Sequence, residues 1–262
     1  MKKYIFNFIF ISVLISFCSS CSDDDKYNPI MISYLDKSIV FDNNTTKLSL
    51  SPFSDILTLE INGGDGSYSI NNTNKEAINA TLNGNSFTLE PVTLGDAEIT
   101  ISDNSGNSCK FSVRVAYQST IYEVFVTEAI VEGDNLTIVD KKKFEEEILK
   151  NISVQAKGKY ELIHCNCNNN IGCIKIYPAQ TGESIEGEFQ YETKENAGLY
   201  TIKTKDKTYS YHFTTFGKLD AKSTPAPLFQ FTEDVTDKYK QAYPALEKAY
   251  AIQGLRTLNN HW

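Results

Sequence analysis

The sequence lacks the features that would assign it to a common functional class. It has three histidines and one tryptophan in 262 residues, and it contains no HExxH, GxSxG or P-loop motif. Positive charge is also scarce, because 33 acidic residues outnumber 25 basic ones and the net charge is −8. An acidic chain without a basic patch argues against nucleic acid as a partner. We therefore expect no enzyme, no cofactor and no nucleic-acid partner.

No hydrophobic run reaches the roughly 20 residues that a helix needs to cross a bilayer. The apolar stretch at residues 4–17 is shorter, and it follows Lys2 and Lys3. A basic start, a short apolar segment and small residues just before Cys21 are typical of a secretory signal that is removed. We predict a signal peptide over residues 1–20.

The apolar stretch is followed by Cys18-Ser19-Ser20-Cys21. This segment resembles the lipobox of bacterial lipoproteins, in which small residues precede a cysteine that is acylated and becomes the mature N-terminus. The resemblance implies that Cys21 is the lipid-anchor residue, with Cys18 standing where that family usually has leucine. More than one palmitate-type chain on Cys21 would anchor the protein stably, since a single chain binds only marginally. The alternative is an ordinary Cys21 behind a cleaved signal peptide.

The next residues, Ser22-Asp23-Asp24-Asp25, form an acidic run. They resemble the export signal of Bacteroides-type surface lipoproteins, which directs the protein to the outer face of the outer membrane. The resemblance implies an outer-membrane, lipid-anchored protein exposed at the cell surface, and a periplasm-facing anchor is the alternative. Because like charges repel, we predict that residues 21–39 form a solvated, lipidated tether.

Residues 40–117 alternate apolar and polar side chains in short runs. Phe111, Val113 and Val115, for example, share one face of such a run. A period of two predicts half-buried strands, and about seven strands at roughly ten-residue spacing predict an antiparallel β-sandwich. The seven runs are KLSL, ILTLEI, SYSIN, AINATL, FTLE, AEITIS and CKFSVRVAY.

Three of these stretches, INGGDGSYSI, LNGNSFTLEP and LGDAEITISDNSG, with the closing FSVRV, resemble bacterial immunoglobulin-like domains of exported Bacteroides-type proteins. The resemblance implies an N-terminal Ig-like β-sandwich that serves as a spacer or binding module. The glycines at residues 62–66 lie between two predicted strands, and no lysine follows them. We therefore interpret them as a β-turn that needs positive φ, rather than as a phosphate-binding loop.

Residues 118–262 predict a second β-rich domain of α+β type and unknown topology. Phe144, Ile148 and Ile152 recur at the spacing of a buried helical stripe, with Asp140 as the expected N-cap. The strand runs that follow are KYELIHC, GCIKIYP, IEGEFQYE, LYTIKT and TYSYHFTTF. The overall prediction is a mainly β protein.

The segment HCNCNNNIGC concentrates side chains that bind metals, namely His164, Cys165, Cys167 and Cys173. These residue types are those that bind zinc in proteins. The paired CxxC spacing of zinc sites is absent, however, and cysteines of exported proteins often form disulfides. Cys165 ends one predicted strand and Cys173 begins the next, so they can face each other across a hairpin. We predict no metal site and a candidate disulfide between these two, with free thiols as the alternative.

One predicted strand carries an aromatic row, Tyr209, Tyr211 and Phe213. Such a row either stacks on a sugar or partner, or packs in the core, and the large area that aromatics bury favours the core. Glu183 and Glu186 would serve a glycosidase only if held about 5–9.5 Å apart across a cleft.

The lead hypothesis is a lipid-anchored cell-envelope protein that acts as a non-catalytic binding or adhesion module. The expected partner is a glycan or an outer-membrane protein. A pilin-like structural subunit, which assembles by donating a strand, is the first alternative. A glycan hydrolase is the less favoured alternative.

Overall fold

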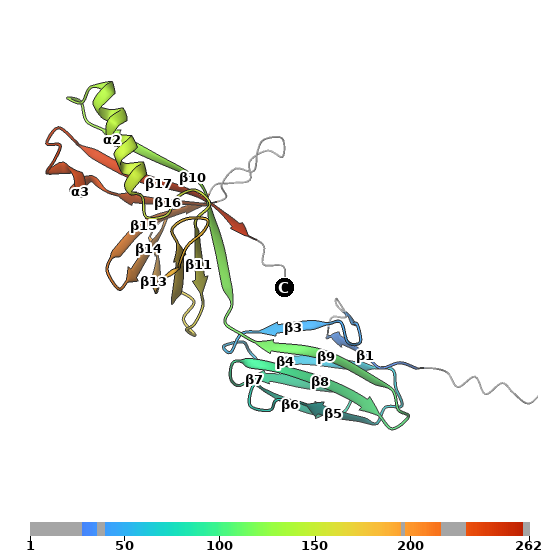
Figure 1. The fold of residues 1–262 in the computed structure, drawn as a ribbon. Helices are drawn as coiled ribbons and strands as arrows, with labels where there is room; N and C mark the ends of the chain where they lie inside the picture. The colour runs from blue at the N-terminus through green and yellow to red at the C-terminus, as the bar shows by residue number, and fades with distance from the viewer. Residues whose placement is uncertain (1–27, 36–39, 195–196, 216–228, 259–262) are drawn as a thin grey trace, which may run out of the picture. The chain divides into compact units, whose positions relative to one another are not determined.

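The computed structural model describes most of the chain, in the ranges 28–35, 40–194, 197–215 and 229–258. Strands dominate these ranges, which also contain two short helices (Figure 1). The predicted mainly β fold is therefore confirmed. The chain divides into two compact units: unit 1 comprises Met1–Leu50 and Ser54–Val115, and unit 2 comprises Ser51–Phe53 and Ala116–Trp262.

Unit 1 contains nine strands in its described residues: β1 (Met31–Tyr34), β2 (Val40–Phe41), β3 (Lys47–Leu50), β4 (Leu57–Asn62), β5 (Tyr68–Asn72), β6 (Ile78–Asn83), β7 (Ser86–Pro91), β8 (Gly95–Asp103) and β9 (Ser108–Val115). They form a five-stranded sheet, β2-β1-β4-β7-β6, and a four-stranded sheet, β3-β9-β8-β5. All pairs are antiparallel except β3 with β9. Side chains from both sheets, including Ile32, Phe87 and Phe111, share one buried core.

The seven runs predicted as strands correspond to β3 through β9. The predicted tether is too long, because Met31–Tyr34 forms β1, pairs with β4 and buries Ile32 in the core. The glycine-rich turn has the expected backbone, since Gly63, Gly64 and Gly66 have φ values of 80°, 64° and 83°.

Unit 2 is a closed barrel of eight antiparallel strands: β10 (Ser119–Glu132), β11 (Lys159–Ile163), β12 (Ile171–Tyr177), β13 (Ile185–Lys194), β14 (Ala197–Thr204), β15 (Thr208–Thr215), β16 (Phe229–Asp234) and β17 (Lys248–Leu258). Each strand pairs with the next one along the chain. Pairing of β10 with β17 closes the barrel, and a register shift between Val124 and Val126 marks a bulge in β10.

Two helices follow strands that finish at the same end of the barrel. α2 (Ile138–Asn151) follows β10, and α3 (Thr236–Lys240) follows β16. Phe144 and Ile148 of α2 are buried, as the stripe predicted, in a separate small core with Tyr239 of α3. Within the described ranges, no helix combines the length and apolar character needed to cross a membrane.

The predicted start of α2 is wrong by a few residues. Thr137 is the N-cap, because its hydroxyl accepts a hydrogen bond from the backbone N–H of Asp140 at 3.1 Å. Asp140 lies in the first turn instead, where its carboxylate accepts from the Thr137 hydroxyl at 2.6 Å. A negative charge in this position favours the helix through its dipole.

Candidate functional site

The middle of the barrel is filled by aromatic side chains. Tyr160, Phe189, Tyr211 and Phe231 are each at most 2% exposed, and the Tyr211 and Phe231 rings stack at 4.8 Å. An eight-stranded barrel has room for its own side chains or for one small ligand. Here the side chains occupy the middle. The core interpretation of the aromatic row is confirmed, because its residues pack against this cluster and Tyr211 belongs to it.

A buried polar network crosses this filled interior. The Tyr160 hydroxyl donates to Gln253 Oε1 at 2.7 Å, and Gln253 Nε2 donates to the Val154 carbonyl at 3.1 Å. The Ser153 and Tyr211 hydroxyls lie 2.7 Å apart. Burial raises the pKa of Tyr160 to about 12, so its phenol remains a donor at neutral pH. Because these groups satisfy one another, we assign the network to stability.

A second aromatic group lies at the end of the barrel away from the helices. We call it the aromatic layer, and it consists of Tyr122, Tyr191, Tyr200, Phe213 and Phe229, from β10, β13, β14, β15 and β16. Neighbouring rings touch, with centroids 4.8 Å apart for Tyr191 and Tyr200 and 5.4 Å apart for Tyr122 and Phe229. All five side chains are half-buried. The layer therefore meets solvent, whereas the filled middle does not.

The three tyrosine hydroxyls of the aromatic layer make no hydrogen bond within the described residues. Burial is the main cause that raises the pKa of Tyr200 and of Tyr122. The remaining contribution comes from neighbouring phenols, including Tyr191, and no carboxylate or ammonium group of the described residues contributes. Among the described residues, the layer therefore consists of uncharged rings and holds three hydroxyls without a hydrogen-bond partner.

His164 follows β11 at the same end of the barrel, and the buried Phe189 lies between it and the aromatic layer. Its ring lies 5.9 Å from that of Phe189, which in turn lies 6.0 Å from Tyr200. His164 Nδ1 is buried and has no hydrogen-bond partner in the part of the chain that the structure describes. A buried polar atom without a partner costs about 1–3 kcal/mol, so this nitrogen is a local cost to stability.

The disulfide loop, residues 164–170, lies at the same barrel end. Cys165 and Cys173 form a disulfide with Cα atoms 6.0 Å apart, which is the pairing proposed from the sequence. The bond occupies two of the four side chains considered for zinc. Cys167 in the loop is an exposed free thiol. The disulfide ties the loop to β12, next to the strand end that holds His164.

Two glycines leave space for the aromatic rings. A Cβ on Gly198 would lie 2.8 Å from the Tyr191 hydroxyl, and one on Gly172 would lie 2.5 Å from Cε1 of Phe189. Both distances are far shorter than van der Waals contact. The rings of Tyr191 and Phe189 therefore lie directly on the backbone of neighbouring strands, in positions that any larger residue would block.

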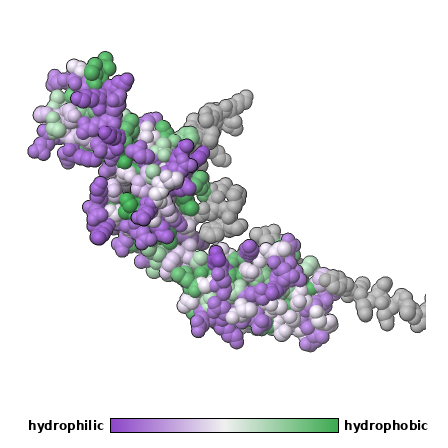
Figure 2. All heavy atoms as spheres, viewed as in Figure 1, coloured by the Kyte–Doolittle hydropathy of each residue, from purple (hydrophilic) through white to green (hydrophobic). Residues whose placement is uncertain are grey.

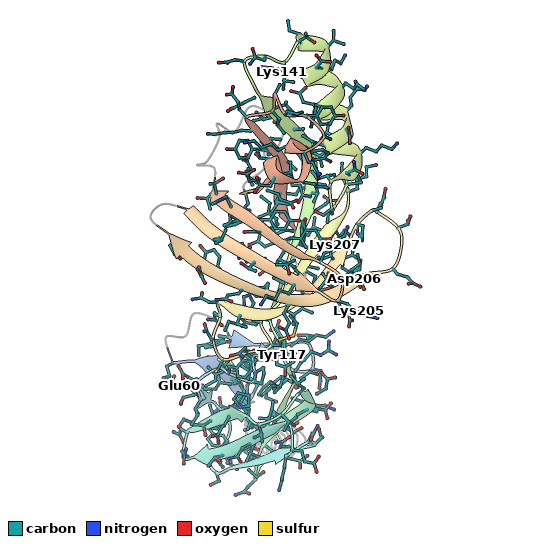
Figure 3. All side chains as sticks on the ribbon, turned by 90° about the vertical axis from the view of Figure 1, so that its left-hand side faces the viewer. Glu60, Tyr117, Lys141, Lys205, Asp206 and Lys207 are labelled. Carbon is teal, nitrogen blue, oxygen red and sulfur yellow. A yellow bond between two sulfur atoms is a disulfide. The ribbon has the colours of Figure 1, made fainter. Side chains whose placement is uncertain are left out.

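The opposite end of the barrel carries charge. Lys205, Asp206 and Lys207 lie in the turn between β14 and β15 (Figure 3). Burial raises the pKa of Glu233, at the end of β16. Tyr209 is half-buried at this end and faces the barrel interior. It therefore offers a matched comparison for the tyrosines of the aromatic layer.

The helical region presents a further apolar surface. Ile138 and Val139, at the start of α2, are 87% and 76% exposed, and apolar side chains appear at this end of α2 in Figure 2. A surface pocket of about 330 Å³ lies beside them, lined partly by Leu136, Phe144 and Tyr243. These residues belong to the small helical core and are separate from the aromatic layer.

The remaining sites predicted from the sequence do not join this layer. Cys21 and the acidic run at residues 22–25 lie outside the described residues, so their roles stay predictions. Glu183 and Glu186 are exposed, before and within the start of β13. No protein-family model and no curated protein matches the sequence.

Proposed function

We propose that the protein is a lipid-anchored cell-envelope protein, held at the outer membrane and exposed at the cell surface. In this proposal the barrel unit is a non-catalytic binding module for a glycan or a protein partner. The observation that carries the proposal is the aromatic layer, whose half-buried tyrosines keep three hydroxyls without a partner in the described chain. Tyrosine is favoured at binding surfaces because it combines apolar area with a polar tip.

Unit 1 serves as an Ig-like spacer in this proposal. The strand orders β1-β4-β7-β6 and β9-β8-β5 correspond to the ABED and CFG sheets of constant-type immunoglobulin domains. This correspondence supports the resemblance seen in the sequence. Strands of both sheets contribute to one core, which favours a self-contained spacer over a pilin-like subunit that awaits a donated strand.

The anchor is tested by metabolic labelling with an alkyne analogue of palmitate. We expect the full chain to take up the label and Cys21→Ala to lose it and leave the membrane fraction. Cys18→Ala is the matched control, because Cys18 would be removed with the signal peptide. Retention of the label in Cys21→Ala would contradict the proposed anchor.

The binding role is tested by applying the full chain, purified in detergent, to a glycan array. We expect at least one glycan to be retained, and we expect a variant with phenylalanine at Tyr122, Tyr191 and Tyr200 to lose it. Tyr209→Phe should bind like the unmodified protein. Retention that is identical in all three proteins would contradict a binding role for the aromatic layer.

A further inference from the structure

We infer that the aromatic layer binds an uncharged ring compound that carries hydroxyl or carbonyl groups around its edge. Neutral sugar rings and neutral nucleosides share this chemistry. The inference rests on the proposed binding function and adds the class of ligand to it.

The apolar part of the ligand follows from the rings. Phe213 and Phe229 stack with centroids 5.4 Å apart and an interplanar angle of 12°, and both are half-buried apolar rings at the barrel end. The C–H face of a sugar or the flat face of a base packs well on such groups. Phe231 and Tyr211 close the interior beneath the layer, at 0% and 2% exposure. The ligand therefore contacts one layer of rings and goes no deeper.

The polar part of the ligand follows from the unused hydrogen-bonding groups. The hydroxyls of Tyr122, Tyr191 and Tyr200 come from three different strands, and each is able to donate and to accept. A purely apolar ligand would bury these groups without satisfying them, at a cost in affinity. A ring with polar groups around its edge would satisfy several of them at once.

The absence of charge follows from the surroundings of the layer. The five side chains that contact one another in the layer are all tyrosine or phenylalanine, which carry no charge at neutral pH. In agreement, no carboxylate or ammonium group of the described chain affects the pKa of Tyr200 or Tyr122, whereas Glu233 raises the pKa of Tyr209 at the opposite end. A charged ligand would lose hydration here without gaining a counter-charge from the described residues. The layer therefore favours neutral sugars over uronic acids, and nucleosides over nucleotides.

The test uses the full chain in detergent and isothermal titration calorimetry with two pairs of probes. One pair is methyl β-glucoside and methyl β-glucuronide, and the other is uridine and uridine monophosphate. We expect binding of at least one neutral probe, and at least tenfold weaker binding of its charged counterpart. Tyr200→Phe and Tyr191→Phe should each weaken the binding of the neutral probe about fivefold, which corresponds to the loss of one hydrogen bond of about 1 kcal/mol. Tyr209→Phe should leave the affinity unchanged.

The outcomes separate the ligand class from the binding function. The probe pair that binds tells whether the ring is a sugar or a nucleoside. If a charged probe binds as tightly as its neutral counterpart and still depends on Tyr200, the ligand class is overturned and the binding module stands. If no probe and no glycan on the array binds in a way that the layer variants weaken, both proposals are overturned. Binding that responds only to Tyr209→Phe would also refute the inference.

Discussion

Replacing Tyr160 by phenylalanine removes one oxygen atom from the filled middle of the barrel. That hydroxyl is fully buried, donates to Gln253 Oε1 at 2.7 Å and lies 3.3 Å from the Tyr211 hydroxyl. Gln253 is itself 1% exposed, so its oxygen would lose its donor in a buried site. An unsatisfied buried acceptor costs about 1–3 kcal/mol. We expect Tyr160→Phe to lower the free energy of unfolding of the barrel unit by about 2 kcal/mol.

The same substitution at Tyr200 removes the same atom from the aromatic layer, with a different expected result. The Tyr200 hydroxyl has no hydrogen-bond partner among the described residues, so the variant breaks no such bond. We expect the free energy of unfolding to change by less than about 0.5 kcal/mol. The two variants should then differ by about 4–8 °C in Tm for a unit of this size.

The measurement is urea unfolding followed by circular dichroism, with calorimetry for Tm, on the parent protein and both variants. Tyr209→Phe extends the comparison, because its hydroxyl also lacks a partner in the described chain. An equal decrease in the free energy of unfolding of Tyr160→Phe and Tyr200→Phe would refute the reasoning, since the Tyr200 hydroxyl would then have a stabilising partner. If Tyr160→Phe leaves the free energy of unfolding unchanged, the buried network adds no stability.

Three further changes test other parts of the barrel. Gly198→Ala should displace the Tyr191 ring, and titration calorimetry should then show that a neutral probe binds about tenfold or more weakly. An unchanged affinity would contradict the close packing of this ring. Burial raises the pKa of Tyr160 to about 12, above its unfolded value. The contribution of this phenol to the free energy of unfolding is therefore complete below about pH 10 and is lost as the pH rises toward 12. The urea midpoint of the parent protein should fall between these pH values, and that of Tyr160→Phe should fall less. Replacing Cys165 and Cys173 together by serine opens a loop with a sequence separation of 8. In urea unfolding, the free energy of unfolding should fall by about 2–3 kcal/mol. An unchanged midpoint would show that the disulfide is not formed.

The strands of unit 1 could be predicted because each one carries its own signal. In β9 the side chains of Phe111, Val113 and Val115 alternate with exposed ones, and a period of two is sufficient to place them on the core face. β1 escaped prediction because it is only four residues long and adjoins a polar segment. The start of α2 was placed too late because Ile138 and Val139 have strand-like side chains, whereas Thr137 supplies the cap that begins the helix.

The aromatic layer could not be predicted in the same way, because its members are far apart in the sequence. Tyr122 and Phe229 touch only because β10 and β16 both pair with β17 when the barrel closes. Alternation within one strand shows which side chains face inward, as Tyr211 and Phe213 do, but it does not reveal which strands are neighbours. The pairing of Cys165 with Cys173 could be predicted from the sequence because the two strands that it joins are consecutive.

Barrel closure also divides the inward tyrosines by the partners that each one meets. Tyr160 and Tyr211 lie beside the segment that follows α2, and Ser153 and Gln253 supply partners for their hydroxyls. Tyr200 lies one layer further out, where aromatic rings surround it and no side chain of the described residues forms a hydrogen bond with its hydroxyl. A phenylalanine at that position would fill the same volume without burying a hydroxyl. Stability alone therefore does not explain a tyrosine there, whereas the proposed binding of a polar ligand would.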